Sequence, residues 1–133
     1  MRPLRTAVRA GLFAAAVSGD PSTLHALATG RDPLEATEAA GSILLPNERR
    51  RGRLFAAAIP LHLGISIGWA LVLAAVLPRR HTLVAGAAAG LAIAALDLGV
   101  VGRRFERIRA LPLAPQLADH VAYGAAVGAA LRA

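Results

Sequence analysis

The chain contains no cysteine and no lysine. Without cysteine it can form neither a disulfide framework nor a thiolate metal site. Without lysine it cannot carry the phosphate-binding loop in which a lysine follows a glycine-rich turn. The sequence also lacks an HExxH pattern, other tight metal-ligand spacing, and the signature of a nucleophile elbow around any serine. It therefore predicts no cofactor, identifies no catalytic residue and does not specify a metal ion.

Hydrophobic residues, in contrast, are abundant. They make up 56% of the 133 residues, more than the roughly 45–50% of ordinary soluble domains. The net charge of +7 could indicate a nucleic-acid binder, but the arginines stand in short clusters between long apolar runs. That pattern is typical of a multi-pass membrane protein. The sequence thus predicts one domain, residues 1–133, with the lipid bilayer as its partner and no nucleic acid.

Three apolar runs match the length of a membrane crossing, which takes about 20 helical residues for a hydrocarbon core of about 30 Å. Residues 54–77 carry no formal charge, and residues 82–101 carry only Asp97. Residues 114–131 form a shorter run that contains Asp119 and His120. Each is predicted to be a spanning helix.

The N-terminal segment, residues 5–29, allows three interpretations, because its apolar centre is short and Asp20-Pro21 follows it. It could be a cleaved signal peptide, a re-entrant hairpin broken at residues 19–21, or one spanning helix kinked at Pro21, which a membrane bundle tolerates. The last is preferred, because small or polar residues keep one helical stripe across the proline. These residues are Gly11, Ala15, Ser18, Ser22, His25 and Thr29.

Residues 33–45 are predicted to form an interfacial amphipathic helix. Asp32 can cap it, Pro33 suits its first turn, and Glu35 follows Asp32 at capping-box spacing. The segment is too short and too polar to cross the bilayer. The predicted fold class is therefore all-α: a polytopic transmembrane bundle of four spans, the first kinked at Pro21, plus one interfacial helix.

Arginine counts bear on orientation. The loops before the second span and after the third share a side, which holds nine arginines against six on the other. This difference favours the first side as cytoplasmic. A re-entrant first segment would change the distribution to twelve against three, so the charge rule favours the hairpin whereas the small-residue stripe favours the span. The sequence leaves orientation open.

Five ionisable residues form a predicted polar layer in one leaflet. At about 1.5 Å per helical residue, they lie roughly 6–12 Å from the arginine-rich end of their helices. Burying them in lipid would be costly unless they face one another or a wet cavity. The five are His25, His62, Asp97, Asp119 and His120, with Ser22, Ser66 and Tyr123 as supporting residues.

Helical phase indicates that the layer faces inward, because each polar group continues a seam of small residues. The seams join His62 to Ser66, Asp97 to Gly86, Gly90 and Ala94, and His120 to Gly124 and Gly128. The GxxxG pairs at Gly86–Gly90 and Gly64–Gly68 predict helix contacts, and small-residue faces would also allow a homo-oligomer to form.

Three functions fit this layer. The first is structural, with polar contacts fixing helix register or supporting an interaction. The second is binding or transport of a small molecule or an anionic-lipid headgroup. The third is a metal or proton-transfer site. For a headgroup, the arginine-rich end supplies Arg49, Arg50, Arg51, Arg53, Arg103 and Arg104.

Several segments resemble the small four-helix inner-membrane proteins of YagU-like type. The matching points are "RAGLFAAAVSG" in the first helix, a histidine in the second, and H-x-x-Y-G-x-x-x-G in the fourth, here beginning at His120. The chain departs from that family in its few aromatics and in "RALPLAPQ" before the last span. The resemblance implies a multi-pass protein of the bacterial inner membrane without an established reaction.

Overall fold

A computed structural model describes residues 2–132, and those residues form helices and contain no strand. The predicted all-α fold class is thus confirmed for the described chain. A π-helical turn, Asp97–Val101, and a 3-10 turn, Gly102–Arg104, follow the helix Thr82–Leu96. The α-helices are α1 (Leu4–Val17), α2 (Asp20–Thr29), α3 (Glu35–Leu44), α4 (Arg51–Val76), α5 (Thr82–Leu96), α6 (Glu106–Arg109) and α7 (Leu113–Ala130).

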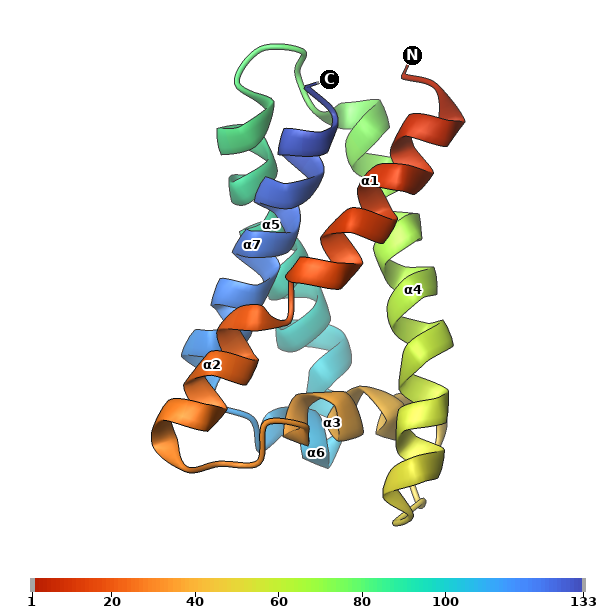
Figure 1. The fold of residues 1–133 in the computed structure, drawn as a ribbon, viewed down its shortest axis with the longest axis vertical. Coiled ribbons are helices and arrows are strands. Elements are labelled where there is room, and N and C mark those ends of the chain that lie inside the picture. The colour runs from red at the N-terminus through yellow and green to blue at the C-terminus, as the bar shows by residue number, and fades with distance from the viewer. Residues whose placement is uncertain (1, 133) are drawn as a thin grey trace.

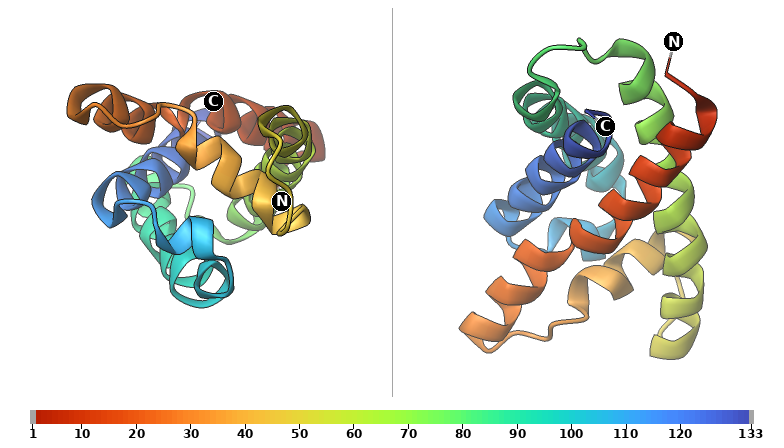
Figure 2. Two further views of the ribbon diagram at one scale, coloured as in Figure 1. Left: turned by 90° about the horizontal axis from the view of Figure 1, so that it is seen from below. Right: turned by 45° about the horizontal axis from the view of Figure 1, so that its top comes forward.

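The long helices run between two ends of an elongated bundle, and α3 lies across one of these ends (Figures 1 and 2). We call that end the α3 end; both termini and the α4–α5 loop lie at the other, the termini end. Helix α5 packs along α7, α1 packs on α4 and α7, and α2 packs on α7. Although a short loop joins α4 to α5, the two helices make at most marginal contact with each other.

Two helices in the described chain are long and apolar enough to cross a membrane: α4, and the continuous helical segment Thr82–Arg104 that begins with α5. Only 22% of the residues in the apolar window of each are buried within the chain. A core helix of a soluble protein would be mostly buried. The prediction of four spans is supported for these two segments alone.

The first segment is a kinked rod. Helix α1 ends before Ser18, and α2 continues in the same direction instead of folding back (Figure 1). Ser18 and Gly19 keep right-handed helical dihedral angles, and Pro21 lies in the first turn of α2. Since proline has no N–H to donate to the preceding turn, the hydrogen-bond ladder is interrupted here. The predicted kink at this place is confirmed.

Helix α3 begins two residues later than its predicted cap implies. Its N-cap is Leu34, and Asp32 instead accepts a hydrogen bond from the backbone N–H of Leu34 at 2.9 Å. Glu35 forms an ion pair with Arg31 at 2.7 Å. The predicted capping box is therefore wrong, because Asp32 closes a local turn and Glu35 has a nearer cation.

The tightest packing is between α5 and α7, where glycines of both helices meet. A Cβ atom on Gly90 would lie 2.1 Å from the carbonyl oxygen of His120, and one on Gly124 would lie 2.0 Å from that of Gly86. The predicted seams of α5 and α7 are confirmed. The Gly64–Gly68 pair of α4 differs, since a Cβ at either position would meet nothing within 4 Å. The contact predicted for this second GxxxG pair is absent from the described residues.

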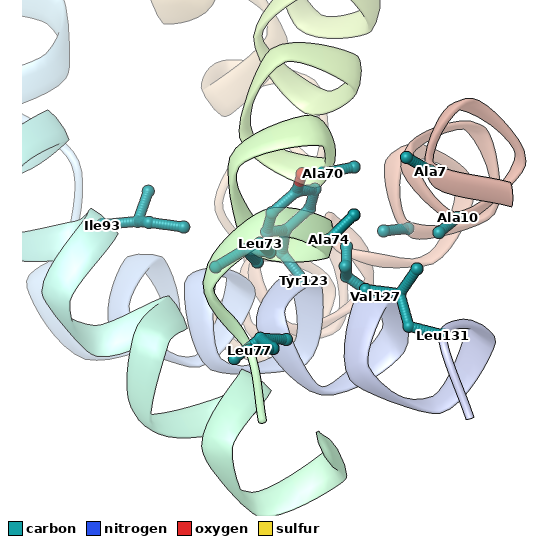
Figure 3. Packing of buried hydrophobic residues seen from close by; sticks show 11 residues of the cluster. Ala7, Ala10, Ala70, Leu73, Ala74, Leu77, Ile93, Tyr123, Val127 and Leu131 are labelled. Atoms are coloured by element: carbon teal, nitrogen blue, oxygen red, sulfur yellow. The ribbon is translucent and has the colours of Figure 1, made fainter. Parts of the chain in front are cut away.

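Alanines make up much of the buried interior, and many large apolar side chains lie on the outside. The main buried cluster joins α1, α4 and α7 through alanines such as Ala10, Ala14 and Ala70, beside Val127 and Tyr123 (Figure 3). Large apolar side chains point outward instead along α4 and α5. On those two helices they include Ile59, Leu63, Val72, Val76, Val84, Leu91 and Leu96.

Arg2 fastens the N-terminal segment to the end of α4. Its guanidinium donates to the carbonyl oxygens of Ala74 at 3.1 Å, Leu77 at 3.0 Å and Pro78 at 3.3 Å. A cation is favourable at a helix C-terminus, where carbonyl groups lack partners in the helix.

We expect Arg2→Met to lower the free energy of unfolding by about 1 kcal/mol, because these carbonyl groups lose a charged donor. Denaturation of the detergent-purified protein measures the effect. Arg5→Met removes an exposed arginine of the same segment and serves as the control. Equal losses in the two variants would contradict the capping role of Arg2.

Candidate functional site

Asp119 of α7 holds the kink between α1 and α2. Its Oδ1 accepts the backbone N–H of Ser22 at 2.9 Å, and its Oδ2 accepts the Ser22 hydroxyl. The first N–H groups of a helix lack partners within it, so the Asp119 carboxylate caps α2 from another helix. Gln116 completes the arrangement, because its Nε2 donates to Ser22 Oγ at 2.8 Å.

His62 of α4 lies on the other side of the same kink. Its Nε2 is 2.9 Å from the carbonyl oxygen of Ala15, which lies in the last turn of α1. Carbonyl groups in a last helical turn lack a partner within the helix, and an oxygen there can only accept, so Nε2 carries the proton. Two neighbouring helices thus satisfy the backbone groups on both sides of the kink.

Asp97 and His120 form the second polar pair, between α5 and α7. His120 Nδ1 is 2.7 Å from the carbonyl oxygen of Gln116 and therefore donates, while Nε2 lies 3.6 Å from Asp97 Oδ2. A neutral His120 would then present the Nε2 lone pair to a carboxylate. The pair is attractive only when a proton lies on Nε2 or on Asp97. At 3.6 Å it is also too long for a direct hydrogen bond.

A cavity of about 470 Å³ connects these groups. It lies between the kink, α4, the end of α5 and α7, and residues of α3 also line it. Most of its wall is apolar. Its ionisable side chains are Asp20, His62, Asp97, Asp119 and His120, with Tyr123 and Gln116 beside them, and no arginine lines it.

The structure brings four of the five predicted polar-layer residues to this cavity; His25 is not among its lining residues. His25 is half-buried on α2, one turn beyond Ser22. Ser66 is buried and lines the cavity, and its carbonyl oxygen accepts the hydroxyl of Tyr123. Ser22 is buried behind Asp119. The supporting residues thus hold helices together around the cavity.

Two of the six arginines predicted to bind headgroups are already paired at the α3 end. Arg51 forms ion pairs with Glu38 and with Asp32, the latter at 2.6 Å, and Arg53 pairs with Glu48 at 3.2 Å. Glu38 also pairs with Arg107, at 3.2 Å. The side chains of Arg49, Arg50, Arg103 and Arg104 form no ion pair within residues 2–132.

Glu48 organises the loop that enters α4. The backbone N–H groups of Arg50 and Arg49 donate to its carboxylate at 2.9 Å each. These two hydrogen bonds, with the Arg53 guanidinium beside them, hold the pKa of Glu48 below its ordinary value. The Glu48 carboxylate therefore stays ionised, and keeps holding the loop, at more acidic pH than an ordinary glutamate would.

Two features of the site were not predicted from the sequence. They are Gln116 and the π-helical turn that begins at Asp97. Gln116 stands three and four residues before Asp119 and His120, a spacing that places all three on one side of a helix, and this could have identified it. A π-turn has no comparable sequence signal. Such turns are frequent at functional sites, and this one begins at the carboxylate that faces His120.

Within residues 2–132, no group of three or more His, Asp or Glu side chains is arranged to hold a metal ion. No protein-family model, curated protein or solved structure matches the chain. The resemblance to the YagU-like proteins accordingly rests on the quoted sequence motifs alone. What the site does is inferred from its geometry.

Proposed function

We propose that the chain is a four-span protein of the bacterial inner membrane, in which α1–α2 and α7 cross beside α4 and α5. The outward-facing large apolar side chains carry this proposal, because soluble monomers rarely expose extensive apolar surface. Alanine and glycine at the helix contacts support it, since close backbone approach replaces the hydrophobic effect between helices in lipid. Helix α3 then lies along the interface.

The function that the cavity supports best is binding of a small amphipathic molecule with a cationic headgroup. Ligand pockets combine apolar walls with a few polar groups, as here. Asp119 already accepts two hydrogen bonds from Ser22, so its carboxylate has a structural role. Asp97 has only the long contact to His120 and keeps acceptor capacity. Since carboxylates line the cavity and arginines do not, an anionic headgroup is disfavoured there.

The poor contact between α4 and α5 supports access from the bilayer. The cavity is lined by α4 at Ile59 and His62 and by α5 at Ile93, yet the two helices hardly touch. An alkyl chain between them would leave the headgroup near Asp97. The small-residue faces of α5 and α7 are occupied by each other, so a homo-oligomer would use the open face at Gly64 and Gly68.

The test compares decylamine, decanol and decanoate as ligands of protein in a zwitterionic detergent. We expect decylamine alone to raise the melting temperature by several degrees, as a ligand at about 100 times its Kd stabilises by about 2.7 kcal/mol. Asp97→Asn should abolish the shift. Asp32→Asn, which removes an exposed carboxylate outside the cavity, should retain it.

Two results would contradict binding at the cavity. One is an equal shift with all three amphiphiles. The other is a full decylamine shift in Asp97→Asn. If Asp97→Asn lowers the melting temperature and no amphiphile changes that of the unsubstituted protein, the polar layer serves the structure alone.

A further inference from the structure

A second candidate site lies at the termini end, opposite the cavity. Four arginines and one histidine surround a groove of about 600 Å³ there. They come from three distant parts of the chain: the N-terminal segment, the α4–α5 loop and the segment after α7. The lining residues are Arg2, Pro3, Arg79, Arg80, His81, Leu131 and Arg132.

The positive charge of this groove is not balanced by acidic side chains. All eight Asp and Glu residues of the chain lie between positions 20 and 119, and residues 49–96 contain none. No Asp or Glu lines the groove. Within residues 2–132, its arginines form no ion pair. At the α3 end, in contrast, Arg51, Arg53 and Arg107 are paired with carboxylates.

The groove is built by specific local structure. Arg2 is fixed by its three hydrogen bonds to the end of α4. His81 has a φ of 58°, a left-handed conformation that is uncommon outside glycine, and it places the loop arginines before the first turn of α5. That turn has no side-chain cap.

We propose that this groove binds a phosphoryl group, with Arg79, Arg80 and Arg132 as the principal donors. Guanidinium groups suit phosphate because their N–H donors match its oxygens in pairs, and the positive end of the α5 dipole adds to the attraction. The phosphate belongs to an anionic phospholipid headgroup or to a soluble phosphate-bearing molecule. The site is independent of the cavity and uses arginines other than those of the α3 end.

The experiment measures thermal unfolding in a zwitterionic detergent with phosphatidylglycerol, phosphatidylcholine or pyrophosphate added. The test variant is Arg79→Gln/Arg80→Gln. The matched control is Arg103→Gln/Arg104→Gln, an adjacent pair of exposed arginines without ion pairs at the other end. We expect phosphatidylglycerol to stabilise the unsubstituted protein and the control, and the test variant to bind it at least tenfold more weakly.

Comparing the added ligands identifies the source of the phosphate. Stabilisation by pyrophosphate without lipid indicates a soluble ligand, whereas a response to phosphatidylglycerol alone indicates the bilayer. Equal weakening in both double variants, or undiminished binding in Arg79→Gln/Arg80→Gln, overturns the proposal. If that variant fails to fold, Arg132→Gln replaces it with the same expectations, since Arg132 is exposed at the end of the chain.

Discussion

Gly90→Ala is expected to destabilise the bundle by about 3 kcal/mol, at the upper end of ordinary overpacking costs. The added Cβ would lie 2.1 Å from the carbonyl oxygen and 2.8 Å from the carbonyl carbon of His120. Both are backbone atoms, so no side chain can move aside and α5 must separate from α7. Reversible denaturation in detergent measures the loss.

Gly68→Ala is the matched control, because it makes the same change in a GxxxG pair whose Cβ position is open. Alanine is a better helix former than glycine by about 1 kcal/mol, so this variant should be neutral or slightly more stable. Similar losses at Gly68 and Gly90 would mean that general helix properties, and not the α5–α7 contact, determine the result.

Asp119→Ala is expected to cost about 3 kcal/mol, since the Ser22 N–H and hydroxyl each lose a charged acceptor in a buried place. Asp119→Asn keeps one carbonyl acceptor and should cost less. In a double-mutant cycle with Ser22→Ala, the loss in the double variant should be smaller than the sum of the single losses, because both substitutions remove the hydrogen bond between the Ser22 hydroxyl and Asp119.

Asp20→Ala is the comparison for Asp119→Ala. Asp20 is also at the kink and lines the cavity, but its side chain is exposed. Its removal should change the free energy of unfolding much less. If the two alanine variants lose equal stability, the capping of α2 by Asp119 is wrong. If the Asp119 and Ser22 effects are additive, the hydrogen bond from the Ser22 hydroxyl contributes no stability.

The five predicted helical segments of this fold agree with the structure to within a few residues, whereas the short helix α6 was not predicted. The predicted segment 82–101 matches α5 with its π-turn, and 114–131 matches α7 within one residue at each end. Apolar run length and proline position are local properties, which explains this agreement. The Gly64–Gly68 pair shows the limit: its spacing equals that of Gly86–Gly90, but only the latter faces another helix.

The candidate site was predictable in part for a similar reason. Periodicity placed Asp97 and His120 on seams that do meet between α5 and α7. The stripe continued through Pro21 predicts His25 as a member of the layer, but on α2 Ser22 and Ala26 are buried and His25 is only half-buried. Which residues of α2 face α7 depends on the angle between α1 and α2, and the sequence does not specify that angle.

Chemical labelling of introduced cysteines tests most directly whether the chain crosses the membrane four times. The chain has no cysteine of its own, so each single-cysteine variant reports on one position. Cysteines at Pro3, Pro78 and Arg132 mark the termini end, and those at Asn47 and Phe105 mark the α3 end. In intact cells, four crossings predict that a membrane-impermeant maleimide labels every position of one group and no position of the other. Labelling of Pro3→Cys together with Asn47→Cys, or of every position, would contradict the four-span bundle.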